Sequence, residues 1–284
     1  TKDIYKFFEQ GGKYYFLSRP RRFGKSLLVS TLKALFSGQQ DLFKDFWIYD
    51  KIEWKKHPVI HIDFSSMSYT TPEILAKNLS KRINEFAQIY HIKLDKKGDY
   101  KEKFRDLLIK LSQQEKVVIL IDEYDKPIID FIGEPTALDN RNVLKNFYEV
   151  MKSSDEDIQF VFLTGVSKFS RVSVFSGLNN LRDITLSQEF STITGYTETE
   201  LQIYFEPYIE LVAQRLHIKT PELLREIKNW YNGYSWDGEN FVYNPYSILS
   251  LLTEKTFRNF WFTSGTPTFL LKLIKDYDVN VANL

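Results

Sequence analysis

Short apolar runs alternate with longer amphipathic stretches along the first two thirds of the chain. The apolar runs are bounded by polar or turn-forming residues, which is typical of strands buried on both faces of a sheet. The stretches between them place apolar residues three or four positions apart, the period of an amphipathic helix. We predict strands at residues 14–18, 59–64, 117–122, 160–165 and 183–187, and helices at residues 25–36, 72–90, 101–113 and 140–152.

This alternation predicts an α/β fold, a parallel five-stranded sheet with helices on both faces. After about residue 195 the strand pattern fades. Thr197 and Glu200 have the spacing of a capping box before a helical pattern that Pro207 is expected to interrupt. A second helix opens at Pro221, a small hairpin is predicted in SWDGENFVYN, and helix returns at Pro245. We expect a core domain at 1–195 and a smaller helical or winged-helix lid at 196–284.

The first predicted strand is followed by the segment RPRRFGKS and then by the first helix. A strand, a tight loop and a helix N-terminus in this order form a phosphate-binding loop, because the loop amides and the positive end of the helix face the anion. Gly24 permits close approach, Lys25 supplies charge for the β- and γ-phosphates, and the Ser26 hydroxyl is a ligand for Mg²⁺. The residues expected to contact the nucleotide are Arg22, Phe23, Gly24, Lys25, Ser26 and Leu27. The helix is expected to bury Leu27, Leu28, Leu32, Leu35 and Phe36.

The common spacing of this motif places a first glycine at position 19, where this chain has Arg19 followed by Pro20. Proline pushes the preceding residue into an extended conformation, so the start of the loop must differ from the common form. Arg19, Arg21 and Arg22 are expected to add positive charge to the loop. The alternative is a helix that begins with GKS by chance, and the next motif argues against it.

The apolar run KVVILI ends in Asp122 and Glu123. Parallel strands present functional groups at their carboxyl ends, so this acidic pair is expected to meet the phosphate loop of a neighbouring strand. Asp122 can hold the Mg²⁺ shell, and Glu123 can orient and polarise the attacking water. The alternative is an acidic pair that only solvates the end of a strand.

The fourth predicted strand ends at Thr164, with Ser167, Lys168 and Arg171 just beyond. A hydroxyl here can sense the γ-phosphate, and a cation can neutralise charge in the transition state. Thr164 or Ser167 is the candidate sensor and Arg171 the candidate arginine finger. An ordinary solvated loop remains the alternative, because no spacing rule selects these residues.

Several segments together resemble the bacterial AAA-ATPase-like family of P-loop ATPases, close to its archaeal and STAND branches. The segments are FLSRPRRFGKSLLVSTLKALF, WKKHPVIHIDFS, VVILIDEYDKPI, FLTGVSKFSRVSVFSGLNNLRDITL and WYNGYSWDGENFVYNPYSIL. The resemblance implies that Arg19 is a family trait. It also implies an ASCE-type (AAA+) sheet, with the acidic strand between the phosphate-loop strand and the side of the second strand, followed by a helical or winged-helix lid.

The resemblance assigns Lys25 and Ser26 to phosphate and magnesium binding, and Asp122 and Glu123 to the acidic motif. ATP as the nucleotide rests on the resemblance, since no base-reading motif is visible in the chain. Family members often continue into a C-terminal domain similar to PD-(D/E)xK nucleases. This chain stops at DVNVANL, so we expect it to be the ATPase portion of a longer protein.

The composition limits which classes of protein and which cellular compartment fit this chain. Hydrophobic residues make up 43% and aromatic residues 16%, which excludes a disordered chain. The longest apolar runs are far shorter than the roughly 20 residues that span a bilayer, so we expect no membrane segment. The absence of cysteine excludes disulfides and thiolate metal sites and fits a cytoplasmic protein. The formal net charge of +1 means that any DNA contact would have to be local.

Other chemical sites have weaker support. His57, His61 and Asp63 lack the HExxH helix or cysteine partners of a zinc site, and GxSxG, typical of hydrolases, does not occur. Glu53 and Lys55 have a nuclease-like spacing without a preceding aspartate. The lysines of IKLDKKGDYKEKFR are expected to form a solvated helix face. The aromatic cluster WYNGYSW is expected to pack, with base stacking as the alternative.

Three functions remain open at this point. The first is an ATPase in which Glu123 activates water and an arginine reaches the γ-phosphate, either Arg171 or one supplied by self-association. The second is a nucleotide-bound switch with negligible turnover. The third is a DNA-binding accessory subunit whose lid acts as a winged helix, and in every case the protein or DNA partner is unidentified.

Overall fold

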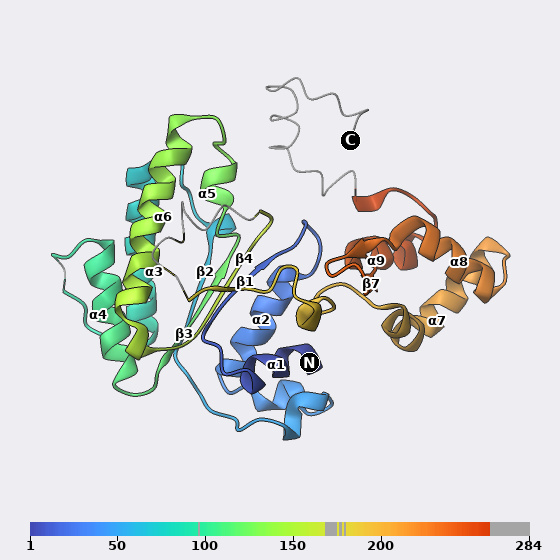
Figure 1. Ribbon diagram of the computed structural model, residues 1–284, viewed down its shortest axis with the longest axis horizontal. Coiled ribbons are helices and arrows are strands. Elements are labelled where there is room, and N and C mark those ends of the chain that lie inside the picture. The colour runs from blue at the N-terminus through green and yellow to red at the C-terminus, as the bar shows by residue number, and fades with distance from the viewer. Residues whose placement is uncertain (96, 168–174, 176–177, 179, 262–284) are drawn as a thin grey trace. The chain divides into compact units, whose positions relative to one another are not determined.

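Five parallel strands form the central sheet in the order β2-β3-β4-β1-β5 in the computed structural model of the chain (Figure 1). The structure describes all residues except 96, 168–174, 176–177, 179 and 262–284. The strands are β1 (Tyr14–Ser18), β2 (Val59–Asp63), β3 (Val117–Asp122), β4 (Ile158–Gly165) and β5 (Arg182–Asp183). The predicted α/β fold is confirmed. One detail differs, because β4 lies between β1 and the acidic strand β3, and the strands that carry the two motifs are therefore not direct neighbours.

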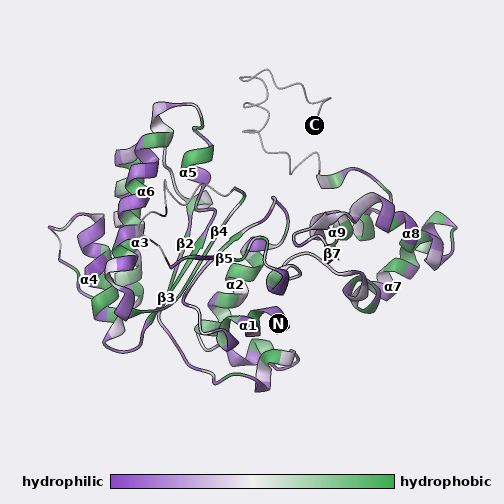
Figure 2. Ribbon diagram, in the orientation of Figure 1, coloured by the Kyte–Doolittle hydropathy of each residue, from purple (hydrophilic) through white to green (hydrophobic). Residues whose placement is uncertain are grey.

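Helices cover both faces of the sheet, as predicted (Figure 1). One face packs against α3, α4 and α6 in the main hydrophobic core, and the other packs against α1 and α2. Figure 2 shows the strands as largely hydrophobic and the covering helices as mixed, because each helix buries only one side. The helices of this part are α1 (Lys2–Glu9), α2 (Lys25–Phe36), α3 (Pro72–Ile89), α4 (Tyr100–Ser112), α5 (Lys126–Ile129) and α6 (Pro135–Ser153). The short 3₁₀ helices are η1 (Gln40–Phe43), η2 (Trp47–Asp50), η3 (Phe64–Ser66), η4 (Asp155–Asp157) and η5 (Gln188–Phe190).

The helix after the phosphate loop has the predicted bounds, but one of its predicted core residues is wrong. Leu28, Leu32, Leu35 and Phe36 are buried, whereas Leu27 is 70% exposed. Successive residues of a helix are about 100° apart, and Leu27 falls on the same side of the helix as the exposed Ser26 and Ser30. A run of leucines alone does not reveal which side of the helix faces the sheet.

The predicted strand at 183–187 is much shorter in the structure. Only Arg182 and Asp183 pair with β1. The chain then leaves the sheet edge, and the carbonyl of Thr185 accepts a hydrogen bond from the Arg19 guanidinium at 2.6 Å. A side chain therefore takes the acceptor that a longer strand would have offered to the ladder.

By internal contacts the chain forms two compact units, Thr1–Ser18 with Ser26–Ile184, and Arg19–Lys25 with Thr185–Leu284. The second unit contains α7 (Glu198–Leu216), α8 (Thr220–Tyr231), the hairpin strands β6 (Tyr234–Ser235) and β7 (Phe241–Val242), and α9 (Pro245–Glu254). This division falls earlier than the boundary we predicted near 195. The phosphate loop groups with the second unit, although β1 and α2 flank it along the chain.

The second unit has the predicted capping box and hairpin. The Thr197 hydroxyl accepts from the Glu200 amide, and the Glu200 carboxylate accepts from the Thr197 amide. Contrary to prediction, α7 continues through Pro207. Pro207 lies on the exposed side of the helix, where water can satisfy the carbonyl that loses its amide donor. No helix within the described residues is long and apolar enough to cross a membrane.

Candidate functional site

The loop between β1 and α2 has an unusual backbone. Arg22 and Gly24 both have positive φ, at 68° and 81°. A Cβ added to Gly24 would meet no atom within 4 Å, so space is open beside this residue, and the backbone conformation is what favours glycine. Open space beside a glycine at the start of a helix is what the close approach of an anion requires.

The Lys25 ammonium is held against the loop itself. Lys25 is only 7% exposed, and its Nζ donates to the carbonyls of Arg19 and Pro20, both at 3.0 Å. A buried ammonium needs such acceptors, and these two fix its position within the loop. Ser26 follows in the first turn of α2, where it is exposed.

Arg19 was expected to add positive charge to the loop for an anion, as were Arg21 and Arg22, but its side chain lies elsewhere. Its side chain is buried, and its guanidinium donates to the carbonyls of Thr185 at 2.6 Å and Phe190 at 3.4 Å. These donors are used inside the protein. Arg22, by contrast, is exposed, and its guanidinium carbon lies 4.6 Å from the Tyr246 ring centroid.

The acidic pair lies at the carboxyl end of β3. Asp122 is buried, and its Oδ1 accepts from the Glu123 amide at 3.0 Å. Ile119 and Ile121 pack into the core on the side of α3, α4 and α6, so Asp122 lies on the opposite face, the face of α1 and α2. Glu123 has a left-handed backbone with φ 51°, which ends the strand at this residue.

Glu123 has a cation beside it. Lys126 Nζ lies 3.9 Å from a Glu123 carboxylate oxygen and 3.6 Å from one of Asp130. Asp130 also accepts from the Tyr69 hydroxyl at 2.6 Å. The sequence analysis did not predict a role for Lys126. Its spacing of three residues from Glu123 could have suggested this contact.

Thr164 ends β4 with a buried hydroxyl. Its side chain is fully buried, and its Oγ1 has no hydrogen-bond partner within the described part of the chain. Thr164 and Asp122 each follow one residue after the paired Leu163 and Ile121, and both lie on the face of α1 and α2. A buried hydroxyl without a partner costs about 1–3 kcal/mol. Thr164 shares this feature with other described residues, among them Tyr148 and Ser154.

The other candidate sensor has a partner inside the protein. The Ser167 hydroxyl donates to the Asp125 carboxylate at 2.8 Å. Arg171, the candidate arginine finger, and Lys168 lie outside the described residues. Of the two candidate sensor hydroxyls, that of Thr164 is the one without a hydrogen-bond partner among the described residues.

Asp125 and Tyr124 connect the ends of β3 and β4, and sequence reasoning did not find this role. Asp125 also accepts from the amides of Val166 at 2.9 Å and Ser167 at 2.7 Å. The Tyr124 hydroxyl donates to the Ser167 carbonyl at 3.1 Å, and the Tyr124 amide donates to the Thr164 carbonyl at 3.1 Å. Burial raises the pKa of Asp125, and the three hydrogen bonds oppose that rise. The only signal in the sequence was a third acid just after the acidic pair.

Replacing Asp125 with Asn should destabilise the protein. All three donors reach the same carboxylate oxygen, Oδ2. Asn can keep an oxygen there, but a neutral amide oxygen is a weaker acceptor than a carboxylate, so we expect a loss of about 1–3 kcal/mol in the free energy of unfolding. Ser167→Ala removes one of the three donors and should cost about 1 kcal/mol. Urea unfolding of both variants measures these losses, and an Asp125→Asn variant as stable as the wild type would show that the carboxylate is no better an acceptor here than an amide.

The discounted metal site gains nothing from the structure. Within the described ranges, no three His, Asp or Glu side chains are grouped so that they could hold a metal ion. Burial lowers the pKa of His61, and the charge of Lys33 adds to the effect. The His57 Nδ1–H donates to the Lys116 carbonyl at 2.9 Å, which is a structural contact.

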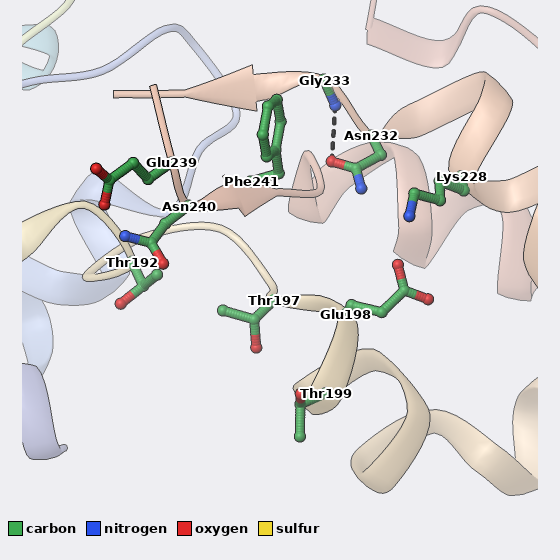
Figure 3. Close-up of a pocket in the computed structure, with 10 residues that line it drawn as sticks. All are labelled: Thr192, Thr197, Glu198, Thr199, Lys228, Asn232, Gly233, Glu239, Asn240 and Phe241. Atoms are coloured by element: carbon green, nitrogen blue, oxygen red, sulfur yellow. Dashed lines mark hydrogen bonds between the residues drawn. The ribbon is translucent and has the colours of Figure 1, made fainter. Parts of the chain in front are cut away.

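A separate pocket lies within the second unit. Its volume is about 720 Å³, and Figure 3 shows its side chains around the N-terminus of α7 and the β6–β7 hairpin. The residues that line it are Thr192, Thr197, Glu198, Thr199, Lys228, Asn232, Gly233, Glu239, Asn240 and Phe241. None of these residues belongs to the phosphate loop or the acidic motif.

A parallel sheet of this strand order, with a GKS loop after β1 and an acidic end on β3, is a P-loop NTPase fold. The chain belongs to the predicted AAA-ATPase family, whose match covers residues 1–175.

A protein of Azotobacter chroococcum mcd 1, described as an uncharacterized protein in the vnfD 5′ region, is 42% identical over 270 residues, which are 93% of this chain and 50% of that protein. The chain thus spans about half the length of this relative.

Two solved structures have distant likeness. A Walker-type ATPase of Pyrococcus abyssi is 16% identical, with 98% of this chain and 70% of that chain covered and a TM-score of 0.44. The Orc1 protein of Aeropyrum pernix, solved in complex with DNA, is 14% identical, with 78% and 55% covered and a TM-score of 0.35. Likeness at this level says nothing about the chemistry of the site.

Proposed function

We propose that this chain binds ATP with Mg²⁺ at the phosphate loop and hydrolyses it. The observation that carries the proposal is the Lys25 ammonium, which is buried and held by two loop carbonyls, in a loop that leaves open space at Gly24. A fixed cation next to a helix N-terminus is an arrangement that stabilises the phosphate groups of a nucleotide. Membership of the predicted AAA-ATPase family supports the same activity.

The residues available for Mg²⁺ fit its chemistry. Mg²⁺ prefers oxygen ligands and keeps several waters, and Ser26 and Asp122 supply a hydroxyl and a carboxylate. Asp122 is buried and carries its oxygens at the carboxyl end of β3. The bound ion would neutralise charge on the phosphate oxygens.

Glu123 is the proposed general base. Its carboxylate is about one third exposed, which leaves it accessible to water, and the left-handed backbone sets it off from the strand. Lys126 Nζ lies 3.9 Å from this carboxylate, close enough to orient it but too far for a hydrogen bond. The Thr164 hydroxyl is the proposed sensor, because a γ-phosphate oxygen would supply the hydrogen-bond partner that it lacks.

We further propose that the nucleotide state is transmitted to a partner protein or nucleic acid through the second unit. Residues 19–25 belong by their contacts to the second unit. This supports the proposal, because a change in the conformation of the loop would move side chains of that unit. A nucleotide-held switch with negligible turnover uses the same loop and differs only in the outcome of the next experiment.

The test is steady-state release of phosphate from ATP, with nucleotide binding measured on the same preparation. We expect turnover with Mg²⁺ and loss of turnover after removal of the metal by EDTA, restored by added Mg²⁺. Binding without turnover would favour the switch. Absence of binding would overturn the proposal.

A further inference from the structure

The phosphate loop is held by side chains that lie far away in the sequence. Arg19, which stands where the common motif has glycine, is 1% exposed and donates to two backbone carbonyls of residues 185–190. Its guanidinium carbon lies 4.2 Å from the centroid of the Trp236 ring. An arginine over a tryptophan face is attracted by the ring electrons, and the attraction strengthens when water is excluded.

Phe23 makes the second attachment. It is completely buried, and its ring meets those of Tyr234 at 4.7 Å and Trp236 at 5.5 Å, both in edge-to-face geometry. Such pairs are favourable beyond the apolar area they bury. Because Phe23 directly precedes Gly24, its burial restricts the backbone at the point where an anion would approach.

Two more contacts hold the middle of the loop. The Trp261 indole nitrogen donates to the Arg21 carbonyl at 2.9 Å, and the Arg22 guanidinium carbon lies 4.6 Å from the Tyr246 ring centroid. Every loop residue from 19 to 23 except Pro20 therefore has a contact with residues 185–261. The WYNGYSW cluster, for which packing was expected, supplies two of these partners.

We propose that Tyr234 and Trp236, here called the aromatic clamp, are positioning residues for nucleotide binding. The clamp holds Arg19 and Phe23 at the two sides of the loop, and the backbone between them keeps the conformation that receives phosphate. In the common motif a glycine at the first position permits this turn, whereas here the buried Arg19 is fixed by its ring and carbonyl partners. The inference rests on the proposed function, since it concerns the affinity of the same loop for a nucleotide.

The consequence is a coupling between the β6–β7 hairpin and nucleotide affinity. A partner that displaces Trp236 would release Arg19 and Phe23 together and weaken nucleotide binding. A nucleotide on the loop would in turn resist displacement of the hairpin, because such coupling is reciprocal.

The experiment is calorimetric titration of the full chain with a non-hydrolysable ATP analogue and Mg²⁺. Trp236→Ala removes the cation–π contact with Arg19 and the ring contact with Phe23. The loss of one cation–π contact shielded from water should weaken nucleotide binding by about 10-fold. Trp230→Ala is the matched control, because Trp230 belongs to the same aromatic cluster, is 44% exposed and has its ring contacts with Tyr231 and Phe257. We expect its affinity to stay within about 2-fold of the wild type, as for a substitution away from the loop.

A conservative variant separates positioning from folding. Trp236→Phe keeps an aromatic face for Arg19 and should recover most of the affinity, whereas Trp236→Leu, which is also apolar, should not. Tryptophan fluorescence gives an independent readout, because the change in emission on analogue binding should be smaller in Trp236→Phe than in Trp230→Phe. Thermal unfolding of each variant checks the fold, and if Trp236→Ala does not fold, the Phe and Leu variants decide.

Wild-type affinity in a folded Trp236→Ala or Trp236→Leu, in a protein whose binding is lost in Lys25→Ala, would overturn the aromatic clamp and leave the proposed function standing. A wild type that fails to bind the analogue would overturn both.

Discussion

Lys25→Ala is expected to abolish measurable nucleotide binding. The Lys25 ammonium is buried and held by the carbonyls of Arg19 and Pro20, and the loop leaves open space at Gly24. Charge-assisted hydrogen bonds to phosphate are the strongest polar contacts of such a site, so we expect binding to weaken by roughly 100-fold or more. Titration calorimetry with Mg²⁺ and the ATP analogue measures the loss.

The matched control for this variant is Lys33→Ala. Lys33 lies two turns further along the same helix and is exposed, so its removal changes the net charge by the same amount without touching the loop. Its affinity should stay close to that of the wild type. A similar loss in both variants would mean that only general electrostatic attraction holds the nucleotide, and the specific role of Lys25 would be wrong.

Glu123→Gln is expected to leave binding nearly unchanged and to remove turnover. The amide has the shape of the carboxylate but cannot accept a proton from water, so the chemical step should slow by about 10²–10⁴-fold. Binding should persist because the proposed phosphate contacts come from the loop and from α2. Phosphate release and affinity, measured on the same preparation, test both halves of the prediction.

Glu156→Gln provides the comparison, because Glu156 is an exposed glutamate of η4 whose removal changes charge by the same amount. It should turn over ATP at the wild-type rate. If Glu123→Gln also retains turnover, Glu123 is not the base. If turnover falls only because affinity falls, the residue acts in binding, and the assignment would again have to be withdrawn.

Most strands of the sheet could be predicted because each is a short apolar run that the local sequence shows directly. The strand at 117–122 is an unbroken apolar run, and α2 has the bounds that its leucine spacing predicts. Such patterns depend on neighbours within a few positions, and the sequence displays those directly. The short β5 was mispredicted for the opposite reason, since its pairing ends where the Thr185 carbonyl meets Arg19, a residue far away in the chain.

Parts of the candidate site were beyond sequence reasoning. Asp125 reads as one more acid beside an acidic pair, and only the fold brings the amides of Val166 and Ser167 to its carboxylate. The Ser167 hydroxyl was interpreted as a candidate sensor, while its contact with Asp125 depends on two strands lying side by side. In both cases the residue type suggested a polar role, but the tertiary packing decided which group the side chain binds.

The sequence by itself determined the class of the sheet, the bounds of β1 and α2 on either side of the RPRRFGKS loop, and the strand β3 that ends at Asp122, because local periodicity and short spacings encode these features. Only the tertiary structure decided that β4 separates the two motif strands, that Leu27 faces solvent, and that Arg19 is buried against Trp236. The physical reason is the same each time: a side chain's burial and partners depend on residues that fold next to it from distant parts of the chain.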